Sequence, residues 1–391
     1  MKQIAIYTLT SELRDEQAVN SITQDFLGSL GIDYELRDND YSDYGSHALD
    51  IIYIRTGGTE GIFKQLLPSL QAQSSTPIYL LTSGKSNSLA ASMEILSYLR
   101  QHCIKGEIIH GHPSYISRRI QLLAKTGQAR RQLKDCRLGV IGEPSDWLIS
   151  SHVDYKQIKA QLGIELIDIP MQELMSTIAI TPRDYSSRPD DAFPGAECIY
   201  EALKTILEGN QLQGFTLRCF DLLKTVRNTG CWAVAKLNSE GYAAGCEGDI
   251  PALLTMMIAR SLLGISGFLA NPSTINPETG EILFAHCTIP LDMVERYELD
   301  THYESGIGIG IRGFMKEGPV TIFKVSGDLS RHFVAEGYLQ MNLALPDLCR
   351  TQQVIQLKDK QQMAYFLNDP IGNHHIVVPG HQKALLEEML R

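Results

Sequence analysis

Short apolar runs alternate with helix-like patterns through the first two thirds of the sequence. Residues 50–54 (DIIYI) and 77–81 (PIYLL) have the composition of strands that are buried on both faces of a sheet. Segments with an apolar residue at every third or fourth position lie between such runs. This alternation is typical of a parallel, doubly wound sheet that is covered by helices. We therefore expect an α/β fold.

The pattern divides the chain into three parts. It starts again at residues 136–141 (CRLGVI), and after about residue 267 β-rich runs with glycine replace the helical periodicity. A chain of 391 residues is long enough for two or three domains. We expect two Rossmann-like, doubly wound domains, residues 1–135 and 136–266, and a C-terminal β-barrel-like domain, residues 267–391. The polar, proline-containing segment 181–194 is expected to form a loop or lid.

The composition excludes several classes of partner. The net charge is −10 and no stretch concentrates Lys and Arg, which argues against a nucleic acid or an anionic membrane surface. The N-terminal residues lack the apolar core and cleavage site of a secretory signal, and no run approaches the roughly 20 apolar residues of a membrane span. The eight cysteines form no CxxC pair and are expected to be reduced thiols. We therefore expect a cytoplasmic protein.

Acidic residues follow two strands that are expected to be neighbours. Asp221 comes directly after the expected strand 215–220, and Glu247 comes 26 residues later in a Cys-Glu-Gly-Asp turn. One βαβ unit needs about thirty residues, so this spacing puts the two acids side by side at adjacent strand ends. Asp249, just ahead of Pro251, has the position of a helix N-cap. Glu247 is not explained by capping, and a buried carboxylate needs a cation, a hydrogen-bond partner or a metal.

Imidazoles that could complete such a site lie in the last third of the chain. His374 and His375 precede an apolar strand, and His381 follows it after a Pro-Gly turn. Neighbouring residues on a strand point to opposite faces, so only one of the first two histidines is expected to face a given site. His286, in the expected strand 282–288, is a further candidate.

Two acids with one or two imidazoles would suit a divalent metal such as Mn²⁺ or Mg²⁺. A metal that holds two neighbouring oxygens of an aldose polarises the carbonyl, and a carboxylate can then move a proton between C1 and C2 through an enediol. The pattern therefore favours an aldose–ketose isomerase, with Glu247 and Asp221 as metal ligands and acid/base groups, His374 or His375 as the third ligand, and Asp249, His286 and His381 in supporting positions.

Five segments in this order resemble the L-fucose isomerase and L-arabinose isomerase superfamily, and in particular its shorter fucose isomerase-related members. The resemblance covers mainly residues 214–381. Its segments are RCFD at 218–221, GCxAxAxLN at 230–238, CEGDIxALxT at 246–255, AHCT at 285–288 and GNHHxxxxGH at 372–381.

The resemblance implies two Rossmann-like domains followed by a β-barrel domain. It also implies a manganese-dependent aldose–ketose isomerase in which two acids of the second domain and a histidine of the third bind the metal. By motif these residues are Asp221, Glu247, and His374 or His375. It further implies a simple or deoxy sugar as substrate and a homo-oligomer, trimeric or hexameric.

Two other functions are compatible with the same pattern. One is a sugar-binding or regulatory relative that has kept the fold without catalysis, for which sugar affinity without metal dependence would be diagnostic. The other is an enzyme acting on a sugar phosphate, whose anchor would be the turn at residues 55–59 (RTGGT) or 82–86 (TSGKS). A plain strand-to-helix connection also explains both turns.

Overall fold

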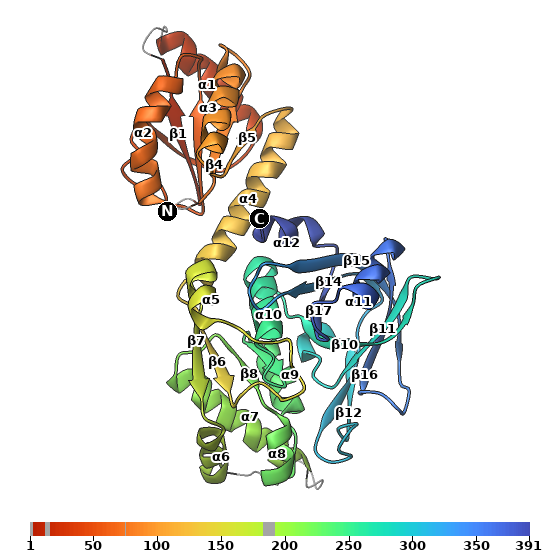
Figure 1. The fold of residues 1–391 in the computed structure, drawn as a ribbon. Helices are drawn as coiled ribbons and strands as arrows, with labels where there is room; N and C mark the ends of the chain where they lie inside the picture. Colours follow the sequence, from red (N-terminus) through yellow and green to blue (C-terminus); the bar gives the residue numbers. More distant parts are fainter. Residues whose placement is uncertain (1–2, 12–15, 75, 183–191) are drawn as a thin grey trace. The chain divides into compact units, whose positions relative to one another are not determined.

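The computed structural model describes residues 3–11, 16–74, 76–182 and 192–391 (Figure 1). They form two compact units, residues 1–131 and 132–391. Most of the expected loop or lid at 181–194 lies outside the described residues. No helix in the described part of the chain combines the length and apolar character that a membrane crossing requires.

The first unit contains a five-stranded parallel sheet with strand order β2-β1-β3-β4-β5. Every residue of β1, β3 and β4 is buried, because helices cover both faces. Side chains of α1 and α4 form the core on one face, and side chains of α2 and α3 form it on the other. The strands are β1 (Ile4–Leu9), β2 (Glu35–Asp38), β3 (Leu49–Ile54), β4 (Ile78–Thr82) and β5 (Gly106–Ile109). The helices are α1 (Glu16–Leu30), α2 (Glu60–Gln73), α3 (Ser88–Gln101) and α4 (Pro113–Leu133).

The second unit begins with a four-stranded parallel sheet of order β7-β6-β8-β9. The expected α/β fold with parallel sheets is therefore confirmed for both halves of the pattern. The strands are β6 (Arg137–Ile141), β7 (Glu165–Ile169), β8 (Gly214–Leu217) and β9 (Ala243–Cys246). The helices are α5 (Tyr155–Leu162), α6 (Met171–Ile180), α7 (Ala192–Gly209), α8 (Phe220–Thr225), α9 (Cys231–Ser239) and α10 (Ile250–Leu263).

The rest of the second unit is a closed, six-stranded antiparallel barrel of order β10-β11-β16-β15-β14-β17, which confirms the expected barrel. A two-stranded ribbon, β12 and β13, accompanies it. The barrel strands are β10 (Phe268–Asn276), β11 (Glu281–His286), β14 (Gly318–Val325), β15 (His332–Leu343), β16 (Thr351–Leu357) and β17 (His375–Pro379). The other elements are β12 (Arg296–Asp300), β13 (Gly310–Phe314), α11 (Met363–Asn368), α12 (Lys383–Met389) and the short 3₁₀ helices η1 (Leu291–Met293) and η2 (Lys360–Gln362).

Helix α10 joins the sheet of the second unit to the barrel. It contacts β8 and β9 on one side and β14 and β17 on the other (Figure 1). Almost all its residues are buried, in keeping with its apolar sequence. Sheet and barrel share one hydrophobic core, which includes Phe215 and Leu217 of β8 as well as Phe284 of β11 and Val377 of β17. This shared core fixes the carboxyl end of β9 against the barrel.

The chain after β8 differs from the expectation. The expected strand 215–220 ends at Leu217, and Phe220 is already the first residue of α8. The backbone turns here because the amide of Cys219 donates to the carbonyl of Leu217, at 2.8 Å. Asp221 therefore lies in the first turn of a short helix rather than at a strand end.

Candidate metal centre

Three side chains from separate elements converge at one end of the barrel. Glu247 directly follows β9, His286 is the last residue of β11, and His374 precedes β17. One ligand atom of each lies within 4.8 Å of the others, and this is the one group of three such residues found in the described part of the chain. Oε1 of Glu247 is 3.7 Å from Nε2 of His286 and 3.5 Å from Nε2 of His374.

Barrel pairing brings the two histidines together although they are far apart in the sequence. Strand β10 pairs with both β11 and β17, with Asn271 opposite Ala285 and Ala270 opposite His375. The residues next to these pairs therefore lie at the same end of the barrel. The ring centroids of His286 and His374 are 5.5 Å apart.

The Cys-Glu-Gly-Asp turn aims Glu247 at the histidines. Glu247 has φ of 61° and Gly248 has φ of 72°, so two consecutive residues adopt the left-handed region. Non-glycine residues rarely adopt it, and such strain is concentrated at functional sites. A Cβ on Gly248 would lie 2.7 Å from Cα of Pro144, so only glycine fits. Asp249 then caps α10, accepting a hydrogen bond from the amide of Ala252 at 2.8 Å, as expected from the sequence.

A second set of side chains orients the imidazoles. Nδ1 of His374 is bonded to Oδ2 of Asp249 at 2.8 Å, and Nζ of the buried Lys324 lies 3.7 Å from the same oxygen. Nδ1 of His286 is 3.0 Å from Oγ1 of Thr288. Because each Nδ1 is engaged, both Nε2 atoms point toward Glu247. This is the arrangement of a carboxylate–histidine–metal relay.

The electrostatics of the site favour a bound cation. Burial would raise the pKa of Glu247, but the neighbouring imidazoles of His286 and His374 hold it far below the usual range. Burial acts the same way on Asp249, yet Lys324 and His374 lower its pKa to about 2. For His374 burial would lower the pKa, and the two carboxylates raise it to about 9. The carboxylates thus stay ionised and stabilise positive charge at the Nε2 atoms.

The donor set fits a divalent metal. Nε2 of His374 is a buried nitrogen with no hydrogen-bond partner, which is costly unless a ligand occupies the space before it. One carboxylate oxygen and two imidazole nitrogens are donors that transition metals accept, and three protein donors leave positions open for a substrate. The residues present would therefore hold a divalent transition metal at this position.

The other predicted site residues lie elsewhere. Asp221 is outside the cluster and pairs with Arg218, whose Nε is 3.3 Å from its Oδ2. His375 faces away from Glu247, with Nε2 3.0 Å from the hydroxyl of Tyr365, and burial lowers its pKa to about 3. His381 is 3.2 Å from the carbonyl of Gly337. The structure thus brings together Glu247, His286 and His374, with Asp249 behind them.

Several residues near the cluster were not identified from the sequence. Lys324 carried a usable signal, because a lysine inside the apolar run 320–325 (VTIFKV) needs a buried partner. Trp147 belongs to no motif, and Phe220 lies in the RCFD segment but was not identified as a site residue. The loop after β12 contributes His302, whose pKa burial lowers to about 4, and Glu304, whose pKa burial and the charge of Glu247 raise.

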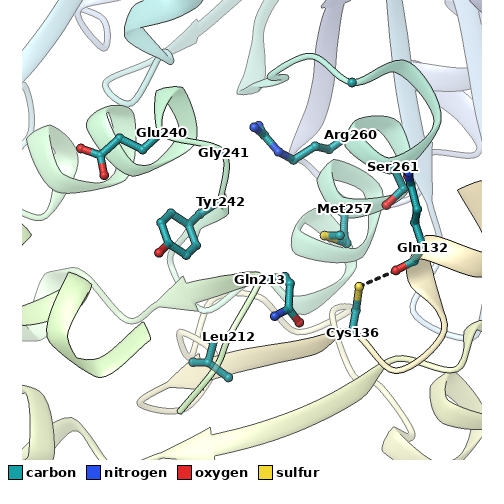
Figure 2. Close-up of a pocket in the computed structure, with 11 residues that line it drawn as sticks. Gln132, Cys136, Leu212, Gln213, Glu240, Gly241, Tyr242, Met257, Arg260 and Ser261 are labelled. Atoms are coloured by element: carbon teal, nitrogen blue, oxygen red, sulfur yellow. Dashed lines mark hydrogen bonds between the residues drawn. The ribbon is translucent and has the colours of Figure 1, made fainter. Parts of the chain in front are cut away.

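Two cavities lie at the sheet of the second unit. A cavity of about 720 Å³ lies at the carboxyl ends of β6, β7 and β8 and is lined by Asp168, Arg218 and Asp221 among others. Another, of about 590 Å³, lies at the opposite edge of the sheet (Figure 2). There Arg260 donates to the carbonyl of Asn238, and the described residues offer no cluster of metal ligands. The second cavity is therefore not part of the metal centre.

Comparison with known proteins finds distant relatives that share one name. Proteins named sulfoquinovose isomerase from Priestia aryabhattai and Priestia megaterium (strain ATCC 12872 / QMB1551) are each 22% identical over 262 residues. These matches cover 61% of this chain and 59% of the relative. A protein of the same name from Clostridium sp. (strain MSTE9) is 22% identical over 222 residues, covering 52% and 48%. The chain thus spans about three fifths of the length of the first two relatives. No family model matches the sequence.

Proposed function

We propose that this chain is a metal-dependent aldose–ketose isomerase that acts on a sugar. The observation that carries the proposal is the Glu247–His286–His374 cluster with its unpartnered, buried Nε2 atom. The names of the relatives support the reaction class. Mn²⁺ is the metal proposed, as in the resemblance given above.

Different side chains of the site would have different roles in such a reaction. A bound divalent metal would supply electrophilic polarisation of the sugar carbonyl. Glu247 and the two imidazoles would hold such a metal, and Asp249 keeps the proton on Nδ1 of His374, so that the lone pair of Nε2 would be available to the metal. The low pKa that Lys324 gives to Asp249 keeps this arrangement ionised at neutral pH.

Proton transfer between C1 and C2 needs a carboxylate that is free to gain and lose a proton. We assign this step to Asp221, which lines the 720 Å³ cavity at the carboxyl ends of β6, β7 and β8. Its side chain is 39% exposed, so a substrate can reach it, and Nε of Arg218 lies 3.3 Å from its Oδ2. Asp221→Asn is expected to abolish turnover while leaving metal content unchanged. Unchanged turnover would remove Asp221 from the mechanism.

The first experiment measures metal content and isotope exchange together. Protein purified without chelator is analysed for metals, reloaded with Mn²⁺ and incubated in D₂O with sulfoquinovose, D-glucose, L-fucose or L-arabinose. The expected result is stoichiometric metal, and a ketose from one of these sugars that carries deuterium at C1, because the enediol exchanges its proton with solvent. Sugar binding without metal would contradict the proposal in favour of a non-catalytic sugar-binding protein.

The assembly is part of the same proposal. A homo-oligomer, trimeric or hexameric, is what the resemblance to the fucose isomerase-related group implies. Light scattering of the purified chain tests it, and a monomer at micromolar concentration would contradict it.

A further inference from the structure

The loop after β6 is fixed against the metal centre on two sides. The amide of Ser145 donates to the backbone carbonyl of Glu247, at 3.0 Å. Arg218 donates to the carbonyl of Pro144 at 2.7 Å and to the carboxylate of Asp146 at 3.2 Å. The residue that follows, Trp147, is therefore held by tethered backbone rather than by a free loop.

Trp147 bonds directly to the carboxylate of the cluster. Its indole N–H donates to Oε2 of Glu247, at 2.6 Å. The other oxygen, Oε1, is the one that faces His286 and His374. An indole N–H can only donate, so this bond commits Oε2 and leaves Oε1 for a metal. Hydrogen bonds of this kind to a ligand carboxylate set its orientation and its basicity.

The ring of Trp147 is also exposed beside the site. The residue is 50% exposed although its one polar atom is already bonded. Phe220 packs against it edge-on, with ring centroids 5.0 Å apart, and His302 packs edge-on against Phe220 at 5.7 Å. Phe220 and His302 support the indole from one side. Its exposed apolar surface lies next to the carboxylate that would hold the metal.

We propose that Trp147 positions Glu247 for metal binding and forms the aromatic surface on which the C–H face of the sugar packs. The second part rests on the proposed function, since it needs a sugar at this metal. Rigid aromatic side chains are common in pockets for small ligands, where they bury apolar area without needing a further polar partner. The same residue would then link the metal site to the substrate site.

Two substitutions separate the two roles. Trp147→Phe keeps a ring but removes the N–H, and Trp147→Ala removes both. The control is Trp232→Phe, because Trp232 makes the same kind of bond, from Nε1 to Oε1 of Glu197 at 2.9 Å, as part of the core. Mn²⁺ affinity is measured by calorimetry on metal-free protein, and thermal unfolding verifies that each variant is folded.

Trp147→Phe is expected to weaken Mn²⁺ binding by about 10- to 100-fold, as for other groups that orient a metal ligand. Trp232→Phe is expected to bind Mn²⁺ like the wild type. At saturating Mn²⁺, Trp147→Ala should raise KM about 2- to 12-fold above that of Trp147→Phe, with a smaller change in kcat. Wild-type Mn²⁺ affinity in Trp147→Phe would overturn the positioning role. Equal KM in the two Trp147 variants would contradict the proposal that the sugar packs on the ring.

Fluorescence gives a readout that does not depend on turnover. The chain has two tryptophans, so Trp232→Phe leaves Trp147 as the single source of tryptophan emission. Mn²⁺ alone should change its emission, and a sugar from the panel above should change it again. A sugar-dependent change without conversion supports the surface while the isomerase proposal fails. If no sugar changes the emission of the metal-loaded protein, the proposal that a sugar packs on Trp147 is wrong.

Discussion

The two parallel sheets have the same kind of strand order and helix cover, yet their carboxyl edges differ in what meets them. In the first unit, polar residues at the carboxyl ends of β1, β3 and β4 form hydrogen bonds within that unit. The amide of Ser11 donates to Oγ1 of Thr56 at 3.0 Å, and the hydroxyl of Thr82 donates to that of Ser88 at 2.7 Å. In the second unit, Glu247 has partners from the barrel, His286 and His374.

The comparison shows that the residues at the end of a parallel strand form a candidate metal site only where another element supplies further ligands. The turns at 55–59 and 82–86 are held by bonds within the first unit, such as the one that joins them, from the amide of Gly57 to the carbonyl of Ser86, at 2.8 Å. Glu247 meets two histidines because the second sheet and the barrel share one core. Among the described residues, no metal-ligand cluster forms at the first sheet.

The strongest test replaces one carboxylate by an amide at the carboxyl edge of each parallel sheet. Glu247→Gln should lower turnover by about 10³-fold or more and release the metal, because a neutral amide binds a divalent cation weakly. Glu60→Gln, which changes the carboxylate that begins α2 after β3, should leave both within twofold. Elemental analysis and steady-state rates measure the outcome. Metal retained in Glu247→Gln, or lost in Glu60→Gln, would break the comparison.

The barrel's contribution is tested with its two adjacent histidines. His374→Asn should weaken Mn²⁺ binding by about 100-fold, because it removes a ligand and the bond to Asp249. His375→Leu should keep the metal but lower the free energy of unfolding by about 1–3 kcal/mol, because the partly buried hydroxyl of Tyr365 loses a partner. Calorimetry and denaturant titration separate the two effects. The reverse pattern would show that the wrong histidine has been placed at the metal.

Lys324 is expected to act through Asp249. Lys324→Met leaves the buried carboxylate of Asp249 without its cation, which should cost about 3–5 kcal/mol of unfolding free energy and weaken Mn²⁺ binding about 10-fold. The control, Lys358→Met, breaks an exposed pair with Glu336 and should cost no more than about 1 kcal/mol. Equal effects of the two substitutions on metal affinity would contradict the role of Lys324.

The smallest expected effect is a pH dependence in metal-free protein. The pKa of Asp249 is about 2 in the folded state and about 4 when unfolded, so folding favours the ionised form. Its stabilisation, of order 2 kcal/mol, is present above pH 4 and is lost as the pH falls from about 4 to about 2. The difference in unfolding free energy between wild type and Asp249→Asn should therefore shrink over this interval. A difference independent of pH would contradict the assignment.

Local sequence was enough for the central strands of the sheets and for the turn that carries Glu247. The apolar runs predicted β3, β4 and β6 and the start of β8, and the Cys-Glu-Gly-Asp segment predicted the cap at Asp249 as well as a carboxylate that capping does not use. Strand alternation also predicted that His374 and His375 would face apart. These features depend on neighbours within a few residues, so a sequence contains them directly.

Only the tertiary structure decided which residues meet. His286 was expected in a supporting position, but closure of the barrel brings its Nε2 to 3.7 Å from Glu247. Asp221 was expected at a strand end, but the turn at Cys219 moves it into α8. Trp147 reaches Glu247 across 100 residues of sequence. Such contacts are set by strand register and by the packing of sheet on barrel, which are long-range properties that no local pattern specifies.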